Sequence, residues 1–140
     1  MDSIINQDEL CTSTETADLL LNKCLLHHNR FPMSIKFIEL SALQSKINEQ
    51  LLNKYLTADE KKQYQFSQTP LNFIAKRIAA KIAFFEIYTG ETKLRYNQIT
   101  VEHDTLGCPY FCAKGRVSGY VLSISDEVNT VAVFCGKTSF

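Results

Sequence analysis

Two cations lie one helical turn apart in an apolar stretch of the sequence. Arg77 and Lys81 both belong to FIAKRIAAKIAFFEIYTG, residues 73–90, which is rich in alanine and isoleucine. A helix that only fills a core has no use for two positive charges at this spacing. One interpretation is that they hold a phosphate, for which both side chains carry suitable donors. The other is that their aliphatic stems carry the charges from a core helix to solvent.

Two groups of cysteine and histidine could bind zinc. Cys24, His27 and His28 lie in one short amphipathic stretch, and no second ligand pair follows at a typical spacing. Cys108 and Cys112 flank Pro-Tyr-Phe, and along a strand they would lie roughly 13 Å apart. The five cysteines form no paired framework. Buried or incidental thiols are therefore the favoured interpretation, and a zinc site is the alternative.

The elements that must position Arg77 and Lys81 are mostly helical in the first two thirds of the chain. Residues 1–15 are polar and residues 16–28 have helical periodicity, whereas residues 34–40 form a short β-rich run. Thr57 and Glu60 fit a capping box at the start of a short helix. The pattern also predicts helices over 43–55 and 70–89, the second with Thr69 as N-cap, Pro70 at its first position and Gly90 at its end.

The last third of the chain changes character. Four strand-like runs, QITVEHD, PYFCAKG, GYVLSIS and NTVAVFC, are separated by turn-rich segments. Helices followed by an antiparallel sheet indicate an α+β fold. We expect the helix over 70–89 to pack across one antiparallel sheet made of these four strands and the run at 34–40.

Composition excludes several classes of protein. The chain has 140 residues, of which 45% are hydrophobic and 21% charged, as in an ordinary single globular domain. Its formal net charge is zero, so no global field attracts nucleic acid or a membrane. No stretch reaches the roughly 20 apolar residues of a membrane span, and the acidic-polar N-terminus is unlike a signal peptide. These features predict a cytoplasmic protein.

The ordered set of motifs resembles the small holo-acyl-carrier-protein synthases of the 4′-phosphopantetheinyl transferase superfamily. The resemblance rests on the run at 34–40, LTADE, FIAKRIAAKIAFFEIYTG, ITVEHDTLGCP and VLSISDEVNTVAVF. It implies a domain over residues 34–140, with residues 1–33 as an N-terminal extension. It further implies a homotrimer, an acyl carrier protein as partner, and transfer of phosphopantetheine from coenzyme A with the help of Mg²⁺. The resemblance also implies that the carrier protein acts in fatty acid or polyketide-type metabolism.

The resemblance also assigns site residues, and several of them depart from the family pattern. The metal-binding aspartate of the first strand falls on Lys36, and the metal-binding glutamate of the long helix falls on Ile82. A helix lysine becomes Glu86, and a late histidine becomes Asp126. The arginine that docks the acidic carrier protein falls on Ala42.

Two basic residues agree with the family pattern. Arg77 and Lys81 occupy family positions whose basic side chains lie near the phosphates of coenzyme A. Lysine and isoleucine cannot ligate Mg²⁺, so an ordinary Mg²⁺ site is not expected between residues 36 and 82. The catalytic candidates are the substituted positions, namely Lys36, Glu86 and Asp126.

The substitutions reverse the charges of two family positions. An acid on the strand and a base on the helix have become Lys36 and Glu86, which predicts that the two side chains pair and fill the place of the metal. The alternative is that both are solvated surface charges on a diverged relative.

Three functions remain open from the sequence. The first is a divergent synthase-like protein that acts with a carrier protein or phosphopantetheine but has lost or altered the standard transfer. A new reaction on a pantetheine-linked substrate belongs to the same class. The second is an active 4′-phosphopantetheinyl transferase in which Glu39, Glu86, Asp126 or Glu127 replaces the lost ligands, or Lys36 replaces the metal charge. The third is a non-catalytic structural subunit, with the apolar strands and Phe84-Phe85 at its trimer interface. The alternative for Phe84-Phe85 is that they belong to the core.

Overall fold

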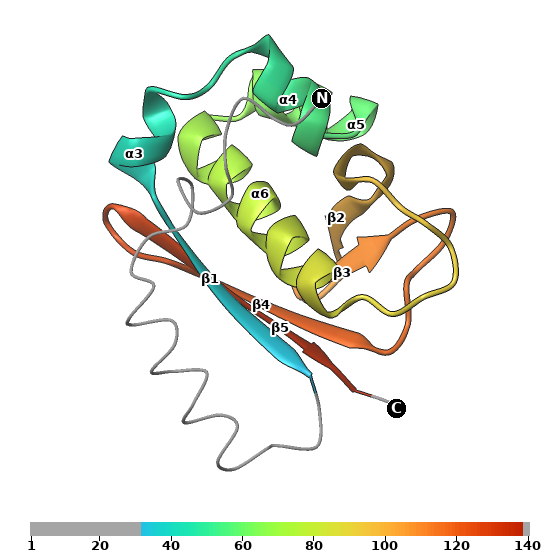
Figure 1. Ribbon diagram of the computed structural model, residues 1–140. Coiled ribbons are helices and arrows are strands. Elements are labelled where there is room, and N and C mark those ends of the chain that lie inside the picture. The colour runs from blue at the N-terminus through green and yellow to red at the C-terminus, as the bar shows by residue number, and fades with distance from the viewer. Residues whose placement is uncertain (1–31, 139–140) are drawn as a thin grey trace.

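A long helix packed on a three-stranded antiparallel sheet forms the centre of the protein. The computed structural model describes residues 32–138. Its elements follow the order β1 (Met33–Glu39), α3 (Leu40–Gln44), α4 (Glu49–Tyr55), α5 (Ala58–Phe66), α6 (Pro70–Ile87), η1 (Tyr96–Gln98), β2 (Thr100–His103), β3 (Pro109–Cys112), β4 (Tyr120–Asp126) and β5 (Thr130–Lys137). Figure 1 shows α6 crossing one face of the sheet. This arrangement confirms the α+β prediction.

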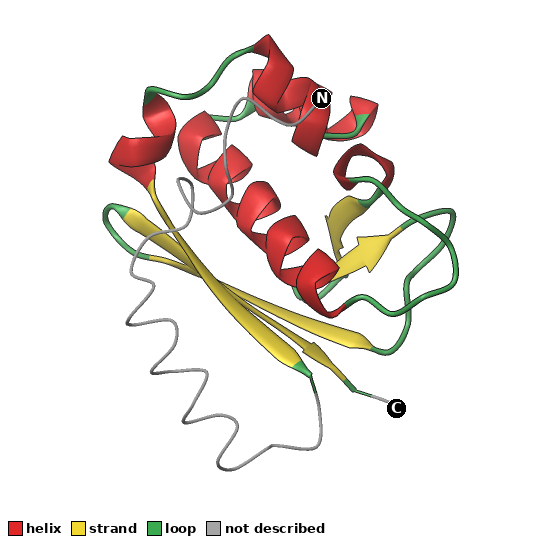
Figure 2. Ribbon diagram, in the orientation of Figure 1, coloured by secondary structure: helices red, strands yellow, loops and turns green. Residues whose placement is uncertain are grey.

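The strands form two sheets, whereas one was predicted. The larger sheet has the order β1-β5-β4, and β2 pairs only with β3 in a second sheet (Figure 2). The chain turns sharply between β3 and β4, where Lys114, Gly115 and Gly119 all have positive φ angles. Only an isolated bridge between Cys112 and Arg116 extends β3 beyond its own pair. The prediction of a single five-stranded sheet was therefore wrong, because the local strand pattern does not encode which strands pair.

The helix predicted over 43–55 is broken in two. Helix α3 ends at Gln44, and α4 begins after Asn48, whose side chain accepts a hydrogen bond of 2.8 Å from the amide of Leu51. An asparagine at an N-cap satisfies a free amide of the first turn and so starts a new helix. The prediction of one uninterrupted helix was wrong, because the apolar spacing alone gave no sign of the cap at Asn48.

The two ends of α6 differ from the prediction in detail, although its span agrees closely. Pro70 occupies the first turn, as predicted, but the side chain of Thr69 makes no capping hydrogen bond. The helix ends at Ile87, and the extended backbone of Tyr88 follows it. Gly90 therefore does not terminate the helix. The capping box of Thr57 and Glu60, by contrast, is confirmed at the start of α5.

The core lies between α6 and the sheet. Ile74, Ile78 and Ile82 of α6 are buried in one core with Ile38, Val131, Val133 and Cys135 of the strands. On another side of the helix, the ring of Phe84 lies 4.5 Å from that of Phe111 in β3. Helix α6 thus contacts both sheets, and its buried side chains are packed between them. Within residues 32–138, no helix is long and apolar enough to cross a membrane.

Candidate functional site

An ion pair joins the first strand to the last turn of α6. The Nζ atom of Lys36 lies 2.5 Å from Oε2 of Glu86. The hydroxyl of Ser34 donates a hydrogen bond of 2.6 Å to the other carboxylate oxygen. Alternate residues of a strand share a face, so Ser34 and Lys36 both point from β1 towards α6. Both carboxylate oxygens of Glu86 are therefore engaged by β1, as the charge reversal predicted.

The Lys36–Glu86 pair is only partly covered. The side chain of Lys36 is 24% exposed and that of Glu86 is 42% exposed. Ser34, in contrast, is almost fully buried. A pair with this much water contact contributes little to stability, typically below about 1 kcal/mol. The site is accessible, so a group from another molecule can reach its ammonium and carboxylate.

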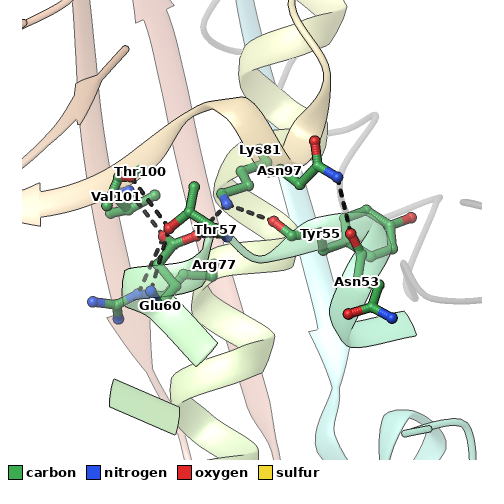
Figure 3. A network of polar contacts seen from close by, with 9 residues as sticks. All are labelled: Asn53, Tyr55, Thr57, Glu60, Arg77, Lys81, Asn97, Thr100 and Val101. Atoms are coloured by element: carbon green, nitrogen blue, oxygen red, sulfur yellow. Dashed lines mark hydrogen bonds and ion pairs between the residues drawn. The ribbon is translucent and has the colours of Figure 1, made fainter. Parts of the chain in front are cut away.

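A second charged cluster includes Lys81, which lies little more than one turn before Glu86 on α6. This cluster is buried. Glu60 and Lys81 have no exposed surface, and their side chains form an ion pair (Figure 3). The ammonium of Lys81 also donates to the carbonyl of Tyr55 at 2.5 Å. Nε of Arg77 lies 4.0 Å from the same carboxylate. Two cations of α6 thus surround one buried anion from α5.

Glu60 also binds backbone groups of two other segments. Its Oε2 accepts a hydrogen bond of 3.0 Å from the amide of Val101 in β2, and its Oε1 accepts one of 3.1 Å from the amide of Thr57. Glu60 therefore links α5, α6 and β2. A buried carboxylate with this many partners is satisfied, whereas removal of one partner would leave an uncompensated charge.

Burial works against the charge on both cations of the cluster. Desolvation lowers the pKa of Lys81, and the negative charge of Glu60 and its hydrogen bond offset part of this effect. Desolvation likewise lowers the pKa of Arg77, which Glu60 partly restores. Arg77 remains charged in any case, because a guanidinium is not deprotonated in proteins. Its guanidinium also packs on the ring of Phe73, with Cζ 4.0 Å from the ring centroid.

The third catalytic candidate, Asp126, ends strand β4 and contacts a different part of α6. Its carboxylate lies 2.6 Å from Nζ of Lys76. Lys76 precedes Glu86 by ten residues, which is about 15 Å along a helix axis. The structure therefore brings Lys36 and Glu86 together and places Asp126 with Lys76 instead. Burial lowers the pKa of His103 in β2, and the charges of Arg77 and Lys76 on α6 add to this effect.

Comparison with known proteins identifies the fold and the family. The structure matches the crystal structure of the holo-[acyl-carrier-protein] synthase from Neisseria meningitidis with a TM-score of 0.64 and 27% identity, covering 76% of this chain and 97% of that one. The synthase structure from Bacillus anthracis, in complex with coenzyme A (3′,5′-ADP), matches with a TM-score of 0.61 at 24% identity, covering 76% of this chain and 96% of that one. The architecture is thus that of the small phosphopantetheinyl transferases.

Sequence comparison reaches the same class. The chain is 35% identical over 106 residues to a holo-[acyl-carrier-protein] synthase of Nitrosospira multiformis, covering 68% of this chain and 85% of that protein. It is 32% identical over 103 residues to a synthase of Neisseria meningitidis, covering 66% of this chain and 82% of that protein. No family model matches the chain. The protein belongs to the holo-[acyl-carrier-protein] synthase family.

The residues at the family's metal positions do not fit Mg²⁺. Lys36 presents an ammonium, and Ile82 is an aliphatic side chain that is 1% exposed and packed in the core. Mg²⁺ requires oxygen ligands, usually at least one carboxylate. Across residues 32–138, no cluster of three His, Cys, Asp or Glu side chains is arranged to hold a metal ion. The cluster predicted from Cys24, His27 and His28 lies outside the described residues.

Sequence reasoning missed three residues that complete these contacts. Ser34 and Lys76 are the partners of Glu86 and Asp126, and neither belongs to a recognisable motif. Glu60 was interpreted only as half of a capping box, although it is also the counter-ion of Lys81. A buried cation in an alanine-rich helix requires a buried anion, so the sequence did indicate that such a partner exists. It did not indicate which carboxylate it is.

Proposed function

We propose that this protein acts with an acyl carrier protein or its phosphopantetheine group, and that it has lost or altered the Mg²⁺-dependent transfer at the family position. One observation carries the proposal: Lys36 and Glu86 pair at 2.5 Å, where the family resemblance expects a metal ligand and a base. The ammonium of Lys36 repels a divalent cation. Ile82 of α6 is aliphatic and buried, so no acidic ligand remains at either family position.

The same pair supports an altered transfer as the second candidate. The side chain of Lys36 is 24% exposed, so its ammonium can stabilise the negative charge of a phosphate without a metal. In such a transfer the carrier serine oxygen forms a bond to phosphorus, the pyrophosphate bond of coenzyme A breaks, and 3′,5′-ADP leaves. Glu86 is the carboxylate next to Lys36, and it could accept the serine proton. Asp126 is held by Lys76, ten residues before Glu86 on α6, so it is a weaker candidate for this role.

Coenzyme A remains the proposed cofactor, and the two predicted phosphate ligands differ in what they can offer. Lys81 has no exposed surface and is bonded to Glu60, so a phosphate would have to displace that carboxylate. Arg77 retains a small exposed surface, at 7%. Arg77 is therefore the stronger candidate for a phosphate contact. The geometry of Lys81 favours a structural role.

The decisive assay incubates the protein with apo-acyl carrier protein and coenzyme A, once with Mg²⁺ and once with a chelator. Mass spectrometry of the carrier protein detects an added phosphopantetheine group. We expect no gain of mass, or a gain that is equal with Mg²⁺ and with the chelator. A gain that requires Mg²⁺ would contradict the proposal. Absence of transfer together with absence of any carrier or coenzyme A binding would leave the third function, a structural subunit.

We also propose a cytoplasmic homotrimer. Its support is the side of the sheet turned away from α6, where Met33, Ile35 and Phe37 of β1 lie on one face with Phe134 of β5. An apolar sheet face of this kind is stabilised by burial against another surface. Light scattering at micromolar concentration should give three times the chain mass, and a monomer mass would contradict this proposal.

A further inference from the structure

The side of the three-stranded sheet that is turned away from α6 carries a row of apolar side chains. Along a strand, alternate residues point to opposite faces. Because Ile38, Val133 and Cys135 are buried in the core with α6, their neighbours along the strands point the other way. We call this surface the outer sheet face, and it consists of Met33, Ile35, Phe37, Val121, Ala132 and Phe134. Helices α4, α5 and α6 lie on the opposite side of the sheet (Figure 1).

The outer sheet face is continuous across the strands and open to solvent in part. Val121 is 47% exposed, and the larger side chains of the face are half-buried. A Cβ atom on Gly136 would lie 3.1 Å from Cζ of Phe134 and 3.4 Å from Cγ2 of Val121, so these two side chains meet over the glycine. Apolar side chains that adjoin one another on a surface are stabilised by burial against a partner.

The chain supplies an apolar segment immediately before β1. Residues 16–28, which lie outside the described residues, have a sequence pattern that predicts a helix. At helical spacing, one side of this segment would carry an apolar stripe made of Ala17, Leu21, Cys24 and Leu25. A helix with such a stripe requires an apolar surface to cover it.

The length and the attachment point of this segment fit the outer sheet face. A helix over residues 16–28 would span about 20 Å, and the 7 residues of β1 span about 23 Å. Only residues 29–32 separate the segment from Met33, which is itself part of the face. Connections of this length are ordinary between packed elements, so the segment can fold back along β1 of its own chain.

We propose that residues 16–28 dock as a helix on the outer sheet face of their own chain. The tether to β1 keeps the segment at a high effective concentration near the face, and docking removes apolar area from water. The proposed homotrimer buries the same face, so the segment and a neighbouring subunit exclude each other there. Docking therefore raises the protein concentration at which copies assemble. The docking itself does not depend on the proposed function.

Native alkylation with iodoacetamide over a range of protein concentrations, followed by peptide mass spectrometry, tests the docking. Cys24 belongs to the predicted stripe, whereas Cys11 belongs to the polar stretch over 1–15. Each rate is divided by the rate of the same cysteine in urea, and Cys24 in the dilute full chain should then react at least about tenfold more slowly than Cys11. Leu21→Glu should remove this protection. Leu19→Glu is the matched control, because it places the same charge about 160° away around the predicted helix, and it should keep the protection.

Two valines test the surface that receives the segment. Val121→Asp places a charge on the outer sheet face, and Val128→Asp places the same charge in the turn between β4 and β5, where the valine is fully exposed. Val121→Asp should remove the protection of Cys24, whereas Val128→Asp should leave it in place. Slow alkylation of Cys135 in both variants shows that the sheet is intact. Equal behaviour of the two variants would show that the segment does not dock on this face.

Light scattering on the same samples tests the competition with assembly. As the mass rises towards three times that of the chain, the protection of Cys24 should fall, and Leu21→Glu should assemble at a concentration about tenfold lower. Protection that stays constant during assembly would overturn the competition. Alkylation of Cys24 as fast as that of Cys11 at every concentration would overturn the docking, and so would protection that increases with concentration, which assigns the segment to a second copy. A chain mass at every concentration together with a protected Cys24 would contradict the homotrimer and support the docking.

Discussion

Lys36 and Glu86 lie 2.5 Å apart, on a strand and a helix that are separated by fifty residues of sequence. The family resemblance expects an acid at the first position and a base at the second. The pair therefore keeps an attraction between β1 and α6, with the positive charge on the strand and the negative charge on the helix. Ser34 adds a hydrogen bond to the same carboxylate, which fixes Glu86 more firmly than an isolated surface pair would. The charge reversal is a local rearrangement that preserves the fold.

The buried cluster around Glu60 predicts a large loss of stability on removal of its negative charge. Glu60→Gln leaves the ammonium of Lys81 buried without a counter-charge, which should lower the free energy of unfolding by about 3–5 kcal/mol. Urea denaturation measures this loss. Glu102→Gln is the control, because Glu102 is exposed and its change should cost less than about 0.5 kcal/mol.

A double variant tests whether the cost comes from the unpaired lysine. Glu60→Gln combined with Lys81→Met removes both charges while roughly keeping side-chain volume, so it should be more stable than Glu60→Gln alone. If the double variant loses the sum of the two single losses, Lys81 and Glu60 are not coupled and the cluster has been misinterpreted.

Cys135 should be chemically inert in the folded protein. Burial raises the pKa of its thiol to about 12, so almost no thiolate is present near pH 8. Cys108 is exposed. Native alkylation with iodoacetamide, followed by peptide mass spectrometry, should modify Cys108 at least roughly 100-fold faster than Cys135. Comparable rates at the two positions would show that the sheet opens readily or that Cys135 is not buried.

The raised pKa of Cys135 also predicts that the protein loses stability at alkaline pH. In the unfolded chain a cysteine ionises near its ordinary pKa of about 8.5, whereas the folded thiol resists ionisation. The unfolded state therefore loses its proton first, and this group withdraws stability between about pH 8.5 and about pH 12. Cys135→Ala should show a smaller decrease over the lower part of this range. An unchanged pH slope in the variant would contradict the assignment.

His103 should titrate below the ordinary range of histidine. Desolvation is the main cause, and the charges of Arg77 and Lys76 add to it. Because the folded pKa is lowered, the unfolded state takes up the proton first as the pH falls, and His103 withdraws stability below about pH 6.5. NMR titration of the His103 ring measures the midpoint. Lys76→Gln should raise that midpoint, whereas Lys62→Gln, an exposed change on α5, should leave it in place.

Sequence reasoning was accurate where the signal is local. The capping box of Thr57 and Glu60 and the start of α6 at Pro70 depend on residues within one turn, and both are found. The division of the strands into two sheets was missed, since pairing depends on contacts between distant segments. The pair of Lys36 and Glu86 was found only because the resemblance aligned the two positions. Glu60 was not connected with Lys81, because 21 residues separate them and no spacing rule relates them.

The last prediction concerns the reversed pair and begins with a single change. Lys36→Asp places a second carboxylate beside Glu86 and should lower stability by about 1 kcal/mol, because the pair is partly exposed. Lys36→Met is the control, since it removes the attraction without adding repulsion. If Lys36→Asp is no less stable than Lys36→Met, the two side chains do not interact in solution.

The triple variant Lys36→Asp, Ile82→Glu and Glu86→Lys restores the family pattern and should create a Mg²⁺ site. Without metal it should be less stable than the parent, because position 82 is buried and a carboxylate there is costly. Mg²⁺ binds two carboxylates in the folded state only, so it should recover stability by RT ln(1 + [Mg²⁺]/Kd), about 2.7 kcal/mol when its concentration is 100 times Kd. Urea denaturation in MgCl₂ and in NaCl of equal ionic strength separates this effect from screening. The parent should respond alike to the two salts. If the parent gains as much from Mg²⁺ as the triple variant does, the metal binds elsewhere and Lys36 and Glu86 have not replaced it. If neither gains, positions 36 and 82 do not face a common site in this protein.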